Sequence, residues 1–594
     1  MTQTTSGRRH AIEATDLFAQ WLSAFAASVE QADAGRISGF FAPDGTWRDV
    51  LSFTWGYRTF EGRPAIEAAL RQTLAPTKPT RVRVADGRSP AKWVRRAGAD
   101  TVEGFFDFDT AVGPGAGFVQ LLPDEGQPAA STVRIGLTSL QGLAEYPEQV
   151  GANRPTGLRW SYTFAGDNWK DERIGALDLA KRTPEVLVVG AGQSGLALAA
   201  RLRVLGVDAI VVEANPRIGD NWRNRYHSLT LHNESWVNHL PYMPFPDSWP
   251  AYVPKDKIAD WLEYYAEAME ADVFTSTRFV SANRDQAADK WNVILSGKDG
   301  ETTGLSVPHI VWATGAVSGT PHVPRMPGLG IYKGEVVHSS AFPGGPGYAG
   351  RRAVVFGTGT SGHDVAQDLY SNGASVSLVQ RGPTTVVSLT PSSALVYSAF
   401  AERPTEDADL FVLAAPYKVL RDGYQRMVRR TRELDAELHE GLEAVGFRTD
   451  EGADETGWHM KYLRRGGGYY INVGASQLVA NGSIGLLNAS QIEGFTQSGV
   501  RLTDGEELEA DLVVFATGFE SQSSTIARAF GAEVSQKVGQ IWDIDDEGYM
   551  NGTWRQTGQE GFWIMGGSLL EARIWSRFLA LQLVTALRGI ETTR

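Results

Sequence analysis

The chain has 594 residues, a net charge of −13 at neutral pH, 42% hydrophobic and 21% charged residues. Its length exceeds what one hydrophobic core supports, so two to four domains are expected, and its composition is that of a folded globular protein. The acidic balance argues against nonspecific nucleic-acid binding. The chain has no cysteine, which excludes enzymes that reduce disulfides through a cysteine pair.

Residues 10–145 are predicted to form a small α+β domain. Apolar residues follow a helical period over 11–33, and a second helix is expected over 63–74, with Pro64 in its first turn. Segments of alternating polarity follow up to residue 140, which is typical of antiparallel strands. The residues that share the apolar face of the first helix are Phe18, Trp21, Leu22, Phe25 and Val29.

The remainder of the chain alternates strands with helices, as doubly wound α/β folds do. A polar, glycine- and proline-rich linker is predicted over 146–184. One nucleotide-binding domain is expected over 185–330 and 511–594, and a second over 331–510 with a helical insert. The apolar segment 561–589 is interrupted by Glu571, Arg573 and Arg577, so it is expected to be a docked helix rather than a membrane span. No secretory signal is evident, and a cytoplasmic protein is expected.

A glycine fingerprint occurs twice, each time between a run of apolar β-formers and a helix rich in alanine or leucine. A turn in this context holds a pyrophosphate against the amino end of a helix. The fingerprints consist of Gly190, Gly192, Gln193, Ser194 and Gly195, and of Gly357, Gly359, Thr360, Ser361 and Gly362. The sequence therefore predicts two dinucleotide sites.

The two units differ at the end of the strand that follows each fingerprint helix. The first ends on Glu213, and the second ends on Gln380 and Arg381. A carboxylate accepts hydrogen bonds from a ribose 2′-hydroxyl, whereas an arginine suits a 2′-phosphate. The second dinucleotide is therefore expected to be a 2′-phosphorylated nicotinamide.

The segment from Tyr332 to Phe342 lies between the two fingerprints and contains Gly334 and His338. It resembles the FxGxxxHxxx(F/Y/W) signature of flavin-containing and Baeyer–Villiger monooxygenases, with Tyr in place of the first Phe. The order of fingerprint, ATG, signature, fingerprint and ATG over 185–520 resembles these class B flavin-dependent monooxygenases. With its additional N-terminal domain the chain is most similar to bacterial type II flavin-containing monooxygenases.

This resemblance implies FAD at the first fingerprint and NADPH at the second, with NADH also accepted. It implies that O2 forms a C4a-(hydro)peroxyflavin, which inserts one oxygen atom into a small lipophilic ketone, sulfide or amine. An N-hydroxylase or an NADPH oxidase of the same fold is an alternative. A further alternative is a flavin-binding scaffold whose N-terminal domain binds the ligand. No metal site, membrane partner or nucleic-acid partner is expected.

The resemblance also implies roles for individual residues. His232 and Asn233 occupy the positions of polar residues near the reactive flavin carbon, and His338 is either catalytic or a structural residue of the linker between domains. Asp220 replaces the second glycine of the family's GGxW stretch. The other expected cofactor-binding residues are Trp222, Arg223, Thr314, Thr517 and Gly518. The candidate cations for ketone oxygenation are Arg464 and Arg465.

The N-terminal domain resembles the cone-shaped ketosteroid-isomerase-like fold. Members of that group can use an Asp or His inside the cone, and Asp49 and Asp107 are the candidates here. These residues form no evident acid–base pair, so the predicted role of the domain is structural or in homodimer formation.

Overall fold

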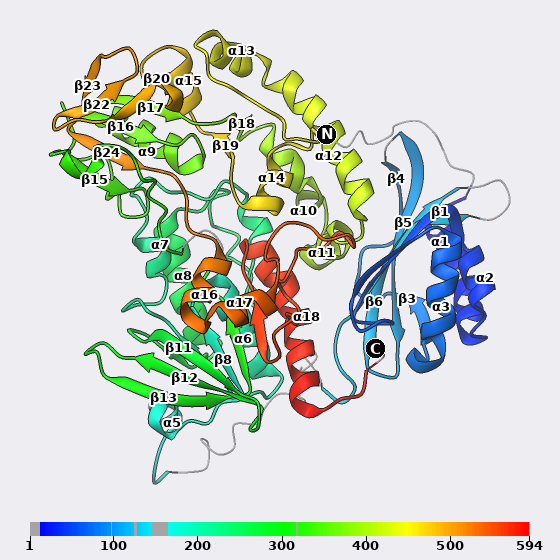
Figure 1. Ribbon diagram of the computed structural model, residues 1–594. Helices are drawn as coiled ribbons and strands as arrows, with labels where there is room; N and C mark the ends of the chain where they lie inside the picture. The colour runs from blue at the N-terminus through cyan, green and yellow to red at the C-terminus, as the bar shows by residue number, and fades with distance from the viewer. Residues whose placement is uncertain (1–11, 97, 124–127, 144–163, 316–318, 593–594) are drawn as a thin grey trace.

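The structure is a computed structural model that describes residues 12–96, 98–123, 128–143, 164–315 and 319–592. Figure 1 shows an N-terminal domain beside two domains that are built on parallel sheets. This arrangement confirms the predicted α+β domain followed by a pair of Rossmann-like domains. Most of the predicted linker 146–184 lies outside the described residues, and its described part contains α5 (Trp169–Ala176) and η2 (Leu179–Lys181).

The N-terminal domain is one sheet with helices on one of its faces (Figure 1). The strand order is β2-β1-β7-β6-β5-β3, and β4 pairs with β5. The predicted apolar face of the first helix packs into this core, where Trp21 is 1% exposed. The elements are α1 (Ala14–Glu30), α2 (Ala34–Gly39), β1 (Phe41–Val50), β2 (Tyr57–Glu61), α3 (Arg63–Thr77), β3 (Thr80–Val84), β4 (Lys92–Arg96), β5 (Ala99–Asp109), β6 (Pro114–Leu122) and β7 (Ala129–Leu137).

The first nucleotide-binding domain has a parallel sheet in the order β10-β9-β8-β14-β25. Its first part contains β8 (Val186–Val189), α6 (Gln193–Val204), β9 (Ala209–Val212), α7 (Asp220–Arg223), η3 (Ser235–Val237), α8 (Lys255–Ala268), β10 (Val273–Phe274), β11 (Arg278–Asp285), β12 (Lys290–Ser296), β13 (Thr302–Val307) and β14 (His309–Trp312). Its second part contains α16 (Gln522–Phe530), α17 (Ala532–Val538), β25 (Phe562–Ile564) and α18 (Leu569–Arg588). Strands β11 to β13 form a separate antiparallel sheet.

The second nucleotide-binding domain has a parallel sheet in the order β15-β24-β16-β17-β20. Its elements are η4 (Leu329–Ile331), β15 (Glu335–His338), β16 (Arg352–Phe356), α9 (Thr360–Ser371), β17 (Ser375–Gln380), β20 (Gly485–Asn488), η6 (Ala489–Gln491), β21 (Ile492–Phe495), β22 (Gly499–Leu502), β23 (Glu507–Glu509) and β24 (Leu512–Phe515). Strand β24 lies inside this sheet, between β15 and β16. The second domain therefore extends to Phe515, and the predicted boundary at residue 510 was too early.

The predicted helical insert follows β18 (Thr385–Ser388), which pairs with β19 (Tyr469–Asn472). Its elements are η5 (Ser393–Tyr397), α10 (Ser398–Glu402), α11 (Thr405–Val412), α12 (Tyr417–Leu434), α13 (Ala436–Ala444), α14 (Gly457–Arg465) and, after β19, α15 (Ala475–Ala480). In Figure 1, α10 and α11 lie between the N-terminal domain and the second nucleotide-binding domain.

The chain crosses between the two nucleotide-binding domains through two segments that lie side by side. Pro321 and Phe519 form an antiparallel bridge. The His322 N–H donates to the Gly518 carbonyl, and the Glu520 N–H donates to the Thr320 carbonyl, each at 2.9 Å. The two crossings are thus joined into a short two-stranded ribbon.

Buried charges attach the N-terminal domain to the insert. Glu103 of β5 pairs with Arg403 at 2.5 Å, and both side chains are at most 2% exposed. Arg48 of β1 donates to the carbonyls of Leu413 and Ala415 at the end of α11. Removing one partner of a buried ion pair costs about 3–5 kcal/mol, so this contact fixes the domain firmly to α10 and α11.

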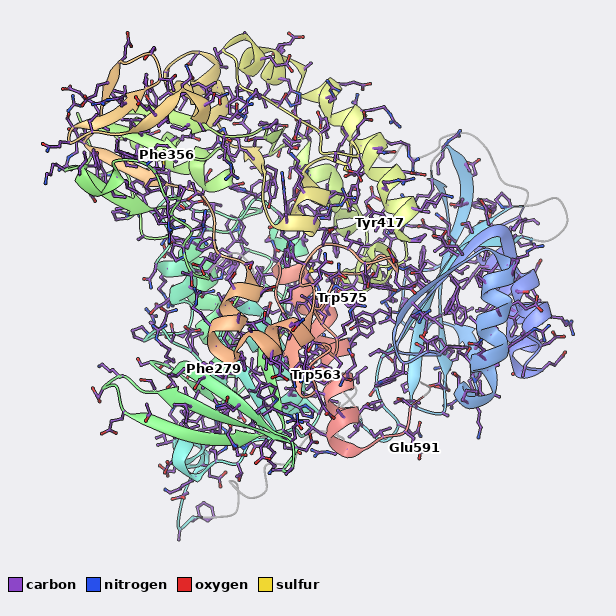
Figure 2. All side chains as sticks on the ribbon, in the orientation of Figure 1. Phe279, Phe356, Tyr417, Trp563, Trp575 and Glu591 are labelled. Atoms are coloured by element: carbon purple, nitrogen blue, oxygen red, sulfur yellow. The ribbon has the colours of Figure 1, made fainter. Side chains whose placement is uncertain are left out.

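Aromatic side chains continue the same interface on to the C-terminal helix. The Tyr57 hydroxyl donates to the Trp554 carbonyl at 2.7 Å, and its ring lies 5.2 Å from that of Trp575, which is labelled in Figure 2. Trp575 belongs to α18, which packs on α6 of the first nucleotide-binding domain. The predicted docked helix is confirmed. None of the described helices has the length and apolarity needed to cross a membrane.

Asp49 provides a test of how the stability of the N-terminal domain depends on pH. Its carboxylate is fully buried in β1 and accepts hydrogen bonds from Phe53 N–H and from Thr54 N–H and hydroxyl. Burial nevertheless raises the pKa of Asp49 to about 6, because desolvation outweighs these bonds. A raised pKa in the folded state means that folding binds a proton. The stability from Asp49 is therefore complete below the unfolded pKa of about 4 and declines until the pH passes about 6.

We expect wild-type protein to lose up to about 3 kcal/mol of stability relative to Asp49→Asn between pH 4 and pH 7. Denaturant unfolding of both proteins across this range measures the difference. A difference in unfolding free energy between the two proteins that stays constant from pH 4 to pH 7 would contradict the raised pKa of Asp49.

Candidate functional site

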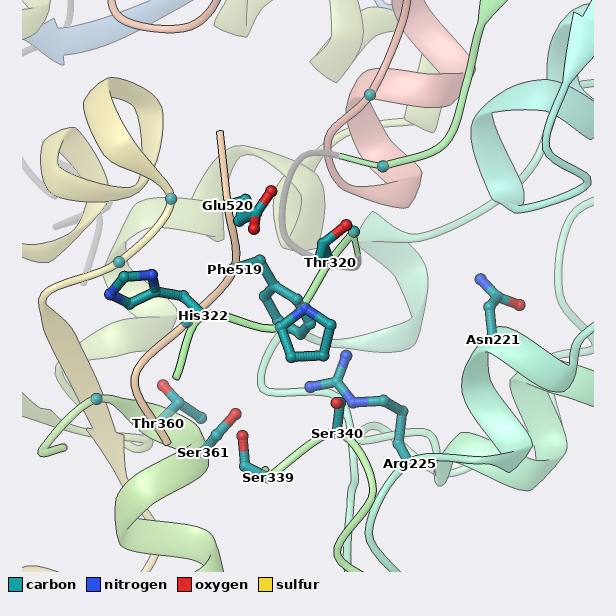
Figure 3. Close-up of a pocket in the computed structure, with 18 of the residues that line it drawn as sticks. Asn221, Arg225, Thr320, His322, Ser339, Ser340, Thr360, Ser361, Phe519 and Glu520 are labelled. Atoms are coloured by element: carbon teal, nitrogen blue, oxygen red, sulfur yellow. The ribbon is translucent and has the colours of Figure 1, made fainter. Parts of the chain in front are cut away.

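Both glycine turns open into one cleft of about 1840 Å³ between the two nucleotide-binding domains. Figure 3 shows part of this cleft, with Thr360 and Ser361 of the second turn on one side, Asn221 on the other and Arg225 between them. A volume of this size exceeds that of one small ligand and allows two dinucleotides to meet.

The first turn is shaped by two close backbone approaches that only glycine allows. Gly190 has φ +109°, and a Cβ there would lie 2.7 Å from the Ala313 carbonyl oxygen. A Cβ on Gly195 would lie 2.0 Å from the Gly190 carbonyl oxygen. Beside Gly192, by contrast, the closest atom is Asn221 Nδ2 at 3.4 Å, so a Cβ would project into the cleft. The turn therefore fits a phosphate group at Gly192, where α6 begins without a side-chain cap.

The second turn repeats this geometry residue by residue. Gly357 has φ +116°, and its Cβ would lie 2.3 Å from the Ala516 carbonyl oxygen. A Cβ on Gly362 would lie 2.0 Å from the Gly357 carbonyl oxygen. Each ATG segment thus begins with the alanine whose carbonyl packs against the first glycine of a turn. The alanines of the two segments are Ala313 and Ala516.

Glu213 lies at the end of β9 beside the first turn. One carboxylate oxygen accepts the Ala191 N–H at 2.9 Å, and the other accepts the backbone and side-chain N–H groups of Asn215 at 2.8 Å. The side chain lines the cleft, and its remaining lone pairs suit the hydroxyls of a ribose. Glu213 therefore both orders the turn and presents an acceptor to the cleft.

Arg381 lies at the corresponding position of the second domain, just after β17. It is exposed and lines the cleft, and none of the described residues forms an ion pair with it. The preceding Gln380 is buried, and its side chain bonds the backbone N–H and carbonyl of Arg448 at 2.9 and 2.8 Å. Gln380 thus anchors the strand end, and Arg381 is the cation available to a ligand.

Most of the predicted site residues line this one cleft. They are Gly190, Gly192, Gln193, Ser194, Glu213, Trp222, His232, Asn233, Thr314, Gly357, Gly359, Thr360, Ser361, Arg381, Thr517 and Gly518. Gly195 and Gly362 lie behind it, where they allow the helices to approach the turns. Arg223 also lies outside the cleft, because its guanidinium binds Asp220, Asp260 and Glu263. Arg225, two residues later, lines the cleft instead.

The monooxygenase-like signature holds the domain crossing in place. A Cβ on Gly334 would lie 2.1 Å from the Tyr332 hydroxyl, which donates to the Ala510 carbonyl. The buried His338 ring contacts Ser340 Oγ at 2.8 Å and the Gly518 carbonyl oxygen at 3.0 Å. Burial lowers the pKa of His338, which favours its neutral form. This geometry supports the structural role of His338 over direct catalysis.

A buried carboxyl group that the sequence interpretation did not include connects the two domains. Asp364 lies in α9, and its Oδ2 accepts the Tyr226 hydroxyl at 2.7 Å. His232 Nε2 lies 4.0 Å from the same oxygen. Burial raises the pKa of Asp364. The only signal for this carboxyl group in the sequence was an acidic residue two positions after the last glycine of the second fingerprint.

The two candidate cations of α14 differ in their surroundings. Arg464 pairs with Asp454 at 2.7 Å and does not line the cleft. Arg465 does line the cleft, beside Asp450 and Gly466. Of the two arginines, only Arg465 can therefore reach a ligand in the cleft.

The N-terminal domain encloses a small cavity of about 30 Å³ between its helices and sheet. Its lining is apolar and contains neither Asp49 nor Asp107. A cavity of this size holds about one water molecule and has no polar group to orient a ligand. It therefore offers no acid or base for catalysis, and the predicted cone-shaped fold remains a prediction.

Comparison with known proteins identifies the family. The model of the FMO-like, flavin-binding monooxygenase-like family matches residues 183–398. Indole-3-pyruvate monooxygenase YUCCA1 of Oryza sativa subsp. japonica is 32% identical over 346 residues, which cover 57% of this chain and 77% of that protein. The probable indole-3-pyruvate monooxygenase YUCCA9 of Arabidopsis thaliana is 31% identical over 344 residues, covering 56% and 75%.

The fold agrees with this assignment. The open crystal structure of cyclohexanone monooxygenase is similar to this chain with a TM-score of 0.51 and 17% sequence identity, over 69% of this chain and 88% of that one. The predicted enzyme class, a flavoprotein monooxygenase, is confirmed. The chain belongs to the flavin-binding monooxygenase-like family.

Proposed function

We propose that FAD binds at the first glycine turn and NADPH at the second, and that the enzyme inserts one oxygen atom of O2 into a small lipophilic ketone. One observation carries this proposal. Two turns of the same geometry face a single cleft, and one presents the acceptor Glu213 while the other presents the cation Arg381. The two cofactors would therefore be distinguished by the charge at their ribose ends.

The residues at the first turn fit FAD in three ways. The free N–H groups at the start of α6 can bind its pyrophosphate near Gly192, and Glu213 can accept the ribose hydroxyls. His232, Asn233 and Arg225 line the cleft farther along the same domain. We assign them to the region of the flavin ring, where Arg225 replaces the predicted Arg223.

When bound, FAD accepts a hydride from NADPH and supplies the reactivity toward O2. In the overall balance, ketone, O2, NADPH and a proton give an ester, NADP⁺ and water. The protein positions both cofactors and limits the access of water, which prevents loss of the oxygen as peroxide. Arg465 is the cleft-lining cation of α14 that can stabilise negative charge on the substrate oxygen.

The names of two relatives support a carbonyl substrate, since both refer to indole-3-pyruvate. Oxygenation of a sulfide or an amine, N-hydroxylation and simple NADPH oxidation are the other outcomes that a product assay separates. A scaffold with a ligand-binding N-terminal domain is disfavoured, because the cavity of that domain has about 30 Å³ and an apolar lining.

The first prediction from the proposed function concerns the reaction itself. Purified protein loaded with FAD should lose its flavin absorbance when NADPH is added without oxygen. In air it should then convert a cyclic ketone to the lactone, with one NADPH consumed per product. Peroxide formation without product would instead identify an oxidase, and persistence of the flavin absorbance would refute the proposed function.

The second prediction separates the two turns. Because an added Cβ would lie 2.0 Å from a carbonyl oxygen in each case, Gly195→Ala should lose FAD, whereas Gly362→Ala should keep FAD but respond weakly to NADPH. Gly304→Ala in β13 is the matched control, since it has no atom within 4 Å of its added Cβ. Flavin content and stopped-flow reduction measure both effects. Identical behaviour of the first two variants would contradict the assignment.

The third prediction concerns Arg381. If its guanidinium binds the 2′-phosphate, Arg381→Ala should raise KM for NADPH about tenfold or more, because a charge-assisted hydrogen bond is lost. KM for NADH should stay within about twofold. The exposed Arg429 of α12 lies outside the cleft, so Arg429→Ala is the control. Equal changes for both nucleotides would show that Arg381 does not contact the phosphate.

A further inference from the structure

Five aromatic residues form one end of the cleft, and we call this end the aromatic chamber. They are Tyr397, Trp458, Tyr462, Tyr469 and Trp542. They come from the end of η5, from α14, from the start of β19 and from the segment between α17 and β25. The chamber therefore has walls from the insert and from the first nucleotide-binding domain.

Contacts between the rings hold these walls together. Trp458 lies 6.3 Å from Tyr397 and 5.6 Å from Tyr469, measured between ring centroids. Tyr462 meets Trp542 edge to face at 6.2 Å. Aromatic pairs at such distances are preferred packing arrangements. The chamber is therefore ordered before any ligand enters.

The chamber lies against both glycine turns. The Tyr462 hydroxyl accepts the Ser568 N–H at 3.0 Å, and the neighbouring Gly567 carbonyl accepts the Gln193 side chain of the first turn at 3.0 Å. On the other side, the Tyr469 carbonyl oxygen is the closest atom to a Cβ on Gly359 of the second turn, at 3.8 Å. A molecule in the chamber would therefore be near both bound dinucleotides.

Two of the three tyrosine hydroxyls are available to a ligand. The Tyr462 hydroxyl is occupied, because it donates to Glu571 at 2.5 Å. The hydroxyls of Tyr397 and Tyr469 have no hydrogen-bond partner within the described part of the chain. Burial raises the pKa of both phenols well above the usual value, so both remain protonated donors.

The acidic groups around the chamber are uncharged or already paired. Burial raises the pKa of Glu571, which favours its uncharged form beneath Tyr462. Asp450 and Arg465 also line this end of the cleft, and Asp450 already pairs with Lys461.

We propose that the aromatic chamber binds the substrate ketone, and that Tyr397 and Tyr469 select it by its carbonyl oxygen. The body of the ketone packs between the rings, and its carbonyl oxygen accepts hydrogen bonds from the two hydroxyls. The inference rests on the proposed monooxygenase reaction and adds the residues that recognise its substrate. A thioether fills the same space without a carbonyl acceptor.

Two substrates of matched shape test this inference. Acetophenone and thioanisole differ at the atom between the ring and the methyl group, where one has a carbonyl and the other a sulfur. We expect Tyr397→Phe and Tyr469→Phe each to raise KM for acetophenone about fivefold to tenfold, and KM for thioanisole by less than about twofold. The control is Tyr424→Phe, because Tyr424 is a buried tyrosine of α12 that does not line the cleft.

Flavin reduction by NADPH without substrate separates this inference from the proposed function. If wild-type protein fails in that reaction, the proposed function is refuted. If it reduces its flavin and oxygenates acetophenone, but both phenylalanine variants keep the wild-type KM for acetophenone, the inference about Tyr397 and Tyr469 is overturned while the proposed function stands. FAD content and the melting temperature of each variant check that the cleft is intact.

Discussion

The approach of three backbone segments at each glycine turn is the constraint on which the rest of the structure depends. In each turn, the carbonyl oxygen of the first glycine occupies the space that a Cβ on the third glycine would need. The carbonyl oxygen of an alanine from an ATG segment packs in the same way against the first glycine. Each turn can therefore form only when the following helix and the ATG segment are both in place. Because these contacts occur in both domains, the second glycine of each turn faces the same cleft, and the charges of Glu213 and Arg381 can act there.

The N-terminal domain influences the site through the insert rather than through a site of its own. Arg48 and Glu103 hold the segment around α10 and α11, and the chain immediately before α10 provides Tyr397 to the aromatic chamber. Separation of this domain would break the buried pair of Glu103 and Arg403 and the hydrogen bonds of Arg48. The domain is thus attached to the segment that leads from Tyr397, although its own cavity is apolar and has a volume of about 30 Å³.

Features that depend on local pattern could be predicted from the sequence. The two strand–turn–helix units, the α+β domain and the helical insert follow from periodicity and glycine spacing, and most predicted cofactor residues line one cleft. Features that depend on long-range pairing could not. Strand β24 pairs with β15 and β16, which places the domain boundary after the predicted residue 510. The Arg223 guanidinium pairs with acidic residues of α8 and therefore does not line the cleft. The aromatic chamber combines four separate segments, and only the helical spacing of Trp458 and Tyr462 hinted at a shared face.

The paired crossings between the nucleotide-binding domains have a mechanical consequence. A single strand between two domains lets them swivel in any direction. Two strands joined by the hydrogen bonds of Thr320 and His322 to the neighbouring crossing resist twisting, but they still bend about a line across the pair. The His338 ring stiffens one end of this ribbon by its contact with the Gly518 carbonyl oxygen. The connection therefore resists rotation about its own length, and we expect any movement of one domain against the other to follow mainly one axis.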